Sequence, residues 1–123
     1  MAEPIRLAVV DDDESVRESL QGLLASLGFA VQTFPSAEDF LASEGAYGTE
    51  CLILDVRMPG MSGPELLEEL CARAREIPTV FITSYGLEDL RPRVRADRAV
   101  NYLHKPFTEE ALLEAIHSAL RRA

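Results

Sequence analysis

The feature that most constrains the fold of this chain is a regular alternation of short apolar runs with runs of helical periodicity. Five apolar runs predict strands: Ile5–Val10, Phe29–Phe34, Cys51–Leu54, Thr79–Thr83 and Val100–Leu103. Between and after them, apolar residues recur at helical spacing, and Ser36, Ser62 and Thr108 stand where helix N-caps are expected. This alternation predicts a parallel sheet with helices on both faces. We therefore expect an α/β fold with a five-stranded, doubly wound sheet in the flavodoxin-like order 2-1-3-4-5.

Five helices should cover this sheet, and the fourth is the weak point of the prediction. It should span Gly86–Arg98, where Pro92 falls near the middle. Proline inside a helix removes a backbone donor and clashes with the preceding turn, at a cost of about 3 kcal/mol. We therefore expect the fourth helix to be short or broken.

Length and charge limit what the chain can bind. Its 123 residues leave room for one core, so we expect a single domain over residues 1–123. The net charge of -9 opposes contact with phosphate backbones, so we expect no direct nucleic-acid binding. No apolar run approaches the roughly 20 residues that span a bilayer, and Met1–Ile5 lacks the pattern of a signal peptide. The sequence thus favours a cytoplasmic protein without a membrane partner.

The two cysteines offer no site. Cys51 and Cys71 each lie in an apolar stretch and lack the spacing of metal ligands. We interpret both as buried, reduced thiols.

Chemically active residues gather where the predicted strands end, which is where open parallel sheets bind ligands. The first strand is followed by Asp11, Asp12 and Asp13, the third by Asp55, the fourth ends in Thr83, and the fifth leads to Lys105. Crowded carboxylates repel one another unless a cation neutralises them. An all-oxygen ligand set favours Mg²⁺, with Mn²⁺ as the alternative. For the three adjacent aspartates, a solvated helix start that complements the helix dipole is equally open.

Asp55 and Lys105 carry the most information. Asp55 ends an apolar run expected to be a central strand, where an uncompensated charge is costly, although a surface turn residue is the alternative. Lys105 is the only lysine in a chain with eleven arginines. A compact ammonium can contact a phosphate as a point charge, whereas an ordinary surface lysine would have no such role.

The order and spacing of these residues resemble the receiver domain of two-component response regulators, over essentially the whole chain. The resemblance rests on four motifs: Val9-Val10-Asp11-Asp12-Asp13, Ile53 through Gly63, Ile82-Thr83, and Asn101-Tyr102-Leu103-His104-Lys105-Pro106-Phe107. The sequence is most similar in character to receivers that carry helix-turn-helix output domains. The resemblance implies a phosphorylation-activated switch in transcription regulation rather than a turnover enzyme.

The resemblance also implies roles for individual residues. Asp55 would accept a phosphoryl group from a sensor histidine kinase. Asp12, Asp55 and the backbone carbonyl of Arg57 would bind Mg²⁺ directly, and Asp11 would act mainly through water. Catalysis would then consist of positioning and charge neutralisation around the phosphoryl group.

Thr83 and Lys105 would hold the phosphoryl oxygens, and Thr83 with Tyr102 would form the switch. In the family the threonine moves toward the phosphoryl group and the aromatic residue turns inward. A strand tyrosine packed against the last helix describes one of these two rotamers. The switch would remodel the face of the fourth helix, fifth strand and last helix, which would control an output domain, a protein partner or a phosphorylation-dependent homodimer.

The lifetime of the signal should depend on Arg57 and Tyr85, which in the family flank the path of the hydrolytic water. Both are bulky and neither is suited to orienting that water, so slow self-dephosphorylation is expected.

Two other functions remain as alternatives. A magnesium-dependent aspartyl phosphatase would need a carboxylate two positions after the nucleophile, where this chain has Arg57. A pseudo-receiver that acts as a constitutive interaction module should have lost a catalytic residue, and none is missing.

Overall fold

A computed structural model describes residues 3–43, 48–83 and 100–121 of the chain. Its elements in chain order are β1 (Arg6–Val10), α1 (Glu14–Ser26), β2 (Ala30–Phe34), α2 (Ala37–Ala42), β3 (Cys51–Asp55), α3 (Gly63–Ala72), β4 (Thr79–Thr83), β5 (Val100–His104) and α4 (Glu109–Arg121). The strands form one parallel sheet in the order β2-β1-β3-β4-β5, which confirms the predicted fold. The helix expected over Gly86–Arg98 lies outside the described residues, so α4 corresponds to the fifth helix of the prediction.

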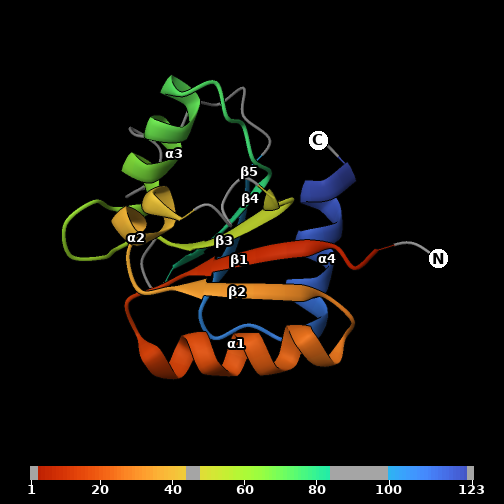
Figure 1. Ribbon diagram of the computed structural model, residues 1–123. Helices are drawn as coiled ribbons and strands as arrows, with labels where there is room; N and C mark the ends of the chain where they lie inside the picture. Colours follow the sequence, from red (N-terminus) through yellow and green to blue (C-terminus); the bar gives the residue numbers. More distant parts are fainter. Residues whose placement is uncertain (1–2, 44–47, 84–99, 122–123) are drawn as a thin grey trace.

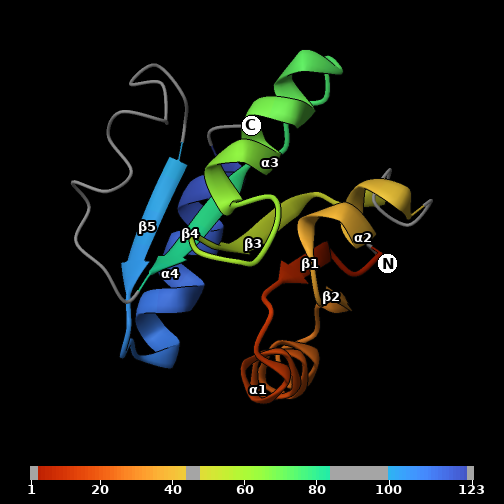
Figure 2. The ribbon, with the colours of Figure 1, turned by 90° about the vertical axis from the view of Figure 1, so that its left-hand side faces the viewer.

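The sheet has helices on both faces, with α1 and α4 on one side and α2 and α3 on the other (Figures 1 and 2). Successive strand residues point to opposite faces, and this alternation divides the core into two clusters. Beneath α2 and α3 lie Ala8, Val10, Leu52, Leu54 and Phe81, among others. Beneath α1 and α4 lie Leu7, Val9, Ile53, Val80 and Ile82, among others. Because β3 is covered on both faces, its apolar residues are all buried and its polar chemistry is confined to its end.

Helix starts and stops follow the local sequence signals. Ser36 Oγ accepts a hydrogen bond from the amide of Asp39 at the start of α2. Ser62, as predicted, caps α3 and forms a capping box with Glu65, and Thr108 Oγ1 accepts a hydrogen bond from the amide of Ala111 at the start of α4. These caps satisfy amides that have no partner within their own helix.

Cys51 is buried, and burial raises the pKa of its thiol to about 12. Cys71 is also a free thiol but is only partly buried, so the prediction of burial is wrong for it. It lies at the edge of the apolar stripe of α3 rather than within it. Among the helices that the structure describes, none has the length and hydropathy needed to span a bilayer.

Candidate functional site

Three carboxylates meet where β1 and β3 end. Asp11 follows β1 and is buried, Asp55 ends β3 and is partly buried, and Asp12 is exposed. Each offers an oxygen atom, and these atoms all lie within 4.8 Å of one another. The strands β1 and β3 are hydrogen-bonded neighbours, so their carboxyl ends coincide as the sequence predicts.

The turn between β1 and α1 divides the three adjacent aspartates between two roles. Asp13 Oδ1 accepts hydrogen bonds from the amides of Ser15 (2.9 Å) and Val16 (3.3 Å) and so caps α1. Asp11 Oδ1 accepts the amide of Asp13 at 2.9 Å. The interpretation as a helix start is therefore correct for Asp13, whereas Asp11 and Asp12 belong to the carboxylate cluster.

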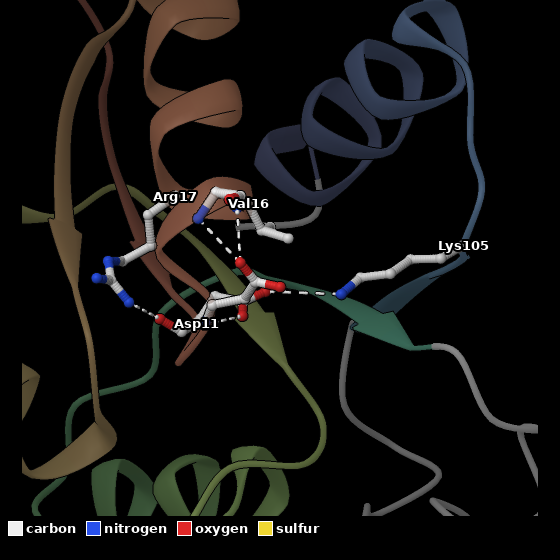
Figure 3. Close-up of polar contacts among 6 residues, drawn as sticks. Asp11, Val16, Arg17 and Lys105 are labelled. Carbon is white, nitrogen blue, oxygen red and sulfur yellow. Dashed lines mark hydrogen bonds and ion pairs between the residues drawn. The ribbon is translucent and has the colours of Figure 1, made fainter.

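The second carboxylate oxygen of Asp11 has an unusual environment. Asp11 Oδ2 is buried, and no hydrogen-bond partner for it occurs in the described parts of the chain. Lys105 Nζ lies 3.7 Å away, close enough for an ion pair but beyond hydrogen-bond distance (Figure 3). A buried carboxylate oxygen without a donor requires a partner. Together with the all-oxygen cluster, it makes the site suited to a hard divalent cation such as Mg²⁺.

Burial, and to a smaller extent mutual repulsion, disfavours the ionised forms of Asp11 and Asp55. Burial, followed by the charge of Asp11, raises the pKa of Asp55 to about 7, while Lys105 acts in the opposite direction. Burial also raises the pKa of Asp11, against the hydrogen bond from the Asp13 amide and the charge of Lys105. A cation that binds the cluster would therefore displace protons near neutral pH.

The ends of β4 and β5 bring the remaining predicted residues to the same edge of the sheet. Thr83 ends β4 and is 1% exposed. The amide of Lys105 donates to the carbonyl oxygen of Thr83 at 2.8 Å. Asp11, Asp12, Asp55, Thr83 and Lys105 thus lie along one edge, whereas Tyr85 lies outside the described residues.

The loop between β3 and α3 contains Arg57, whose side chain is exposed. A Cβ atom on Gly63 would overlap the carbonyl oxygen of Asp55, so only glycine lets α3 start this close to β3. Earlier in the loop Gly60 has φ +76°, and the amide of Met61 donates to Glu38 Oε2 of α2 at 3.1 Å. The loop is therefore fixed against both α2 and β3.

Tyr102 lies on β5 with its ring stacked on that of Phe81, at a centroid distance of 5.9 Å and an interplanar angle of 18°. The two are register partners, and Phe81 belongs to the cluster beneath α2 and α3. The rotamer in which Tyr102 packs against the last helix is not the one in this structure, because α4 covers the opposite face of the sheet. The tyrosine is 36% exposed, and partial burial raises the pKa of its hydroxyl.

The roles of three contributors to the site were not identified from the sequence: Arg17, whose guanidinium donates to the carbonyl oxygen of Asp11, together with Glu38 and Gly63. A Gly-Pro pair directly after the capping serine signals the close approach of Gly63. No local pattern signals Glu38, because it contacts a residue 23 positions away.

Comparison with known proteins identifies the family. The family model of the response regulator receiver domain matches residues 7–117 of the chain. The chain is 44% identical over 117 residues to the response regulator protein TmoT of Ectopseudomonas mendocina, covering 94% of this chain and 52% of TmoT. It is 40% identical over 123 residues to the transcriptional regulatory protein FixJ of Azorhizobium caulinodans, covering 100% of this chain and 58% of FixJ. The chain therefore spans about half the length of these curated relatives.

A solved structure shares the fold. The response regulator protein TrrA of Thermotoga maritima, in complex with Mg²⁺-BeF, matches with a TM-score of 0.80 and 28% sequence identity, covering 94% of this chain and 99% of TrrA. Three observations lead to the same family: the match over residues 7–117, the parallel sheet, and the acidic cluster at the carboxyl ends of its strands. The chain belongs to the response regulator receiver family, and it is a phosphorylation-activated signalling domain, a phosphoacceptor switch rather than a turnover enzyme.

Proposed function

We propose that a sensor histidine kinase transfers a phosphoryl group to Asp55 in a magnesium-dependent reaction, and that residues 1–123 act as one receiver domain. The observation that carries this proposal is the position of Asp55 at the end of a buried strand, within 4.8 Å of Asp11 and Asp12. A surface turn residue would not lie among these carboxylates at the end of a buried strand, and burial, followed by the charge of Asp11, raises the pKa of Asp55.

Asp12, Asp55 and the carbonyl oxygen of Arg57 would bind Mg²⁺ directly, and Asp11 would act through water. Two observations support this set: the buried, unpartnered Asp11 Oδ2 and the complex of TrrA with Mg²⁺-BeF. The ion would neutralise charge on the carboxylates and on the phosphoryl oxygens. Mn²⁺ offers the same coordination chemistry and is the alternative occupant.

In the transfer itself, a carboxylate oxygen of Asp55 forms a bond to phosphorus while the bond from phosphorus to the kinase histidine breaks. The product is an acyl phosphate on Asp55 and a neutral imidazole on the kinase. The hydroxyl of Thr83 would donate a hydrogen bond to one phosphoryl oxygen. The ammonium of Lys105 would move from Asp11 to a second phosphoryl oxygen. These groups act by position and charge, which is how proteins accelerate phosphoryl transfer.

The same movements would transmit the signal. Thr83 would shift toward the phosphoryl group, and Tyr102 would turn inward from its place beside Phe81. Its one-third exposure supports a side chain with room to change rotamer. The altered surface around β5 and α4 would control an output domain or protein partner, in transcription as in FixJ, with a phosphorylation-dependent homodimer as the alternative.

Acetyl phosphate labelling tests the acceptor. Asp55→Asn should keep the fold and lose labelling by more than about a hundredfold, because the amide is nearly isosteric but cannot attack phosphorus. Asp39→Asn changes an exposed carboxylate of α2 and serves as the matched control. Labelling of Asp55→Asn at the rate of the parent would exclude Asp55 as the acceptor. Turnover of free phosphomonoesters by the parent would instead favour the aspartyl phosphatase.

Thermal melts test the metal site independently. At ten times its Kd, Mg²⁺ should stabilise the parent by about 1.4 kcal/mol. The shift should disappear in Asp12→Ala, which removes one predicted ligand from an exposed position. An equal shift in parent and variant would place the cation elsewhere.

Arg57 and Tyr85 would lengthen the life of the acyl phosphate, because neither side chain orients a water for attack. Decay of label from the parent, Arg57→Asn, Tyr85→Ala and the double variant measures their effect. We expect decay to be faster in the variants by up to about tenfold, or about 1.4 kcal/mol in barrier. Unchanged half-lives would show that neither side chain affects hydrolysis of the acyl phosphate.

A further inference from the structure

Arg17 makes a contact that neither the family match nor the proposed transfer reaction explains. It lies in the first turns of α1, and its guanidinium reaches back to the turn that precedes the helix. Arg17 Nη1 donates to the carbonyl oxygen of Asp11 at 2.7 Å (Figure 3). This short, charge-assisted hydrogen bond is stronger than a neutral one. The accepting carbonyl belongs to the peptide that joins Asp11 to Asp12, two members of the carboxylate cluster.

The other contacts of this turn act on different groups. Asp13 donates its amide to Asp11 Oδ1 and caps α1 with its own side chain. Those contacts orient one carboxylate and start the helix. The Arg17 contact fixes the peptide that joins Asp11 to Asp12. The orientation of this peptide determines where the exposed Asp12 carboxylate lies relative to the buried Asp11 carboxylate.

The charge of Arg17 acts against this geometric effect. A guanidinium beside the cluster repels a divalent cation, so its charge alone would weaken metal binding. The hydrogen bond has the opposite influence, because fixing the ligands in advance reduces what must be ordered when the ion binds. The two effects therefore predict opposite outcomes when Arg17 is replaced.

We propose that Arg17 is a positioning residue for the divalent-cation site, because its hydrogen bond to the Asp11 carbonyl holds the Asp11 and Asp12 carboxylates at a spacing suited to a small ion. This inference rests on the metal site of the proposed function. Mg²⁺ requires near-ideal octahedral geometry at short distances, whereas Ca²⁺ accepts irregular and flexible ligand sets. Loss of the contact should therefore impair Mg²⁺ binding more than Ca²⁺ binding.

Calorimetric titration of the full chain with Mg²⁺ and, separately, with Ca²⁺ tests the proposal. Arg17→Gln removes the charge and the reach of the guanidinium, and we expect its Kd for Mg²⁺ to rise about tenfold. The Kd for Ca²⁺ should rise less than about threefold, so selectivity for Mg²⁺ falls. Arg17→Lys keeps the charge without the planar fork and should fall between parent and Arg17→Gln. The matched control is Arg73→Gln, which removes a surface arginine paired with Glu69.

Melting in EDTA checks that each variant is folded, and Arg17→Lys serves as the test if Arg17→Gln is not. Unchanged or tighter Mg²⁺ binding in the Arg17 variants would overturn the proposal and leave only the charge effect. Equal loss of affinity for both ions would also overturn it, because geometry would then play no part. Absence of Mg²⁺ binding in the parent would instead refute the proposed metal site, so the two failures are distinct.

Discussion

The ends of β1 and β3 lie side by side, and each supplies an aspartate to the same cluster, but they are fixed by different means. At the end of β1, side chains hold the turn: Asp11 and Asp13 accept backbone amides, and Arg17 donates a hydrogen bond to the carbonyl oxygen of Asp11. At the end of β3, the backbone itself is held by the close approach of Gly63 to the carbonyl of Asp55. The comparison shows two ways of placing a carboxylate. The side chain of Asp11 takes part in the hydrogen bonds that fix its own turn, whereas Asp55 is positioned by a backbone contact.

The largest expected effect concerns the end of β3 and depends on pH. The pKa of Asp55 is about 7 in the folded chain against an ordinary value of 3.8, so the folded state holds a proton that the unfolded state releases. Stability should therefore fall as pH rises through this range. Without metal we expect a loss of about 2–3 kcal/mol between pH 5 and pH 8.

Urea unfolding in EDTA at several pH values measures this loss. Asp55→Asn should flatten the profile, because the amide does not titrate, and saturating Mg²⁺ should reduce the slope in the parent by favouring the ionised carboxylates. An identical slope in parent and Asp55→Asn would show that another group is responsible.

The next effect tests the backbone contact at the end of β3. Gly63→Ala should destabilise the protein by about 2 kcal/mol, because the new Cβ overlaps the carbonyl oxygen of Asp55, which cannot move without disturbing the strand. It should also weaken Mg²⁺ binding, since Asp55 shifts with its backbone. Gly22→Ala is the control: Gly22 lies inside α1 with open space around it, so the same change should stabilise by up to about 1 kcal/mol. Destabilisation of similar size at both positions would contradict the steric explanation.

Sequence reasoning found what strand periodicity and helix caps determine. Alternating apolar runs predicted the sheet and its order, and strand ends then placed Asp11, Asp55, Thr83 and Lys105 on one edge. It could not assign separate roles to three consecutive aspartates, because a one-residue difference in the turn decides which of them caps the helix.

Contacts between distant segments were also beyond the sequence. Glu38 meets Met61 only because α2 and the loop after β3 are neighbours in the folded chain. The sequence left the packing of Tyr102 open between two rotamers, because a strand with partly exposed residues on both sides gives no clear alternation. Register with Phe81, which only the structure supplies, resolves it.

The smallest effect separates the scaffold of the β1 end from its metal-binding atoms. Asp13→Ala should cost about 1 kcal/mol of stability, because α1 loses the side chain that accepts the amides of Ser15 and Val16. Asp13→Asn should restore most of it, since the amide oxygen accepts the same hydrogen bonds without the charge. If Asp13 is a cap and not a ligand, Asp13→Asn should bind Mg²⁺ within about threefold of the parent, whereas Asp12→Asn should bind it at least about tenfold more weakly. Similar losses of Mg²⁺ affinity in the two asparagine variants would mean that all three aspartates hold the ion. The ends of β1 and β3 would then differ in the number of ligands they supply and not in how each carboxylate is supported.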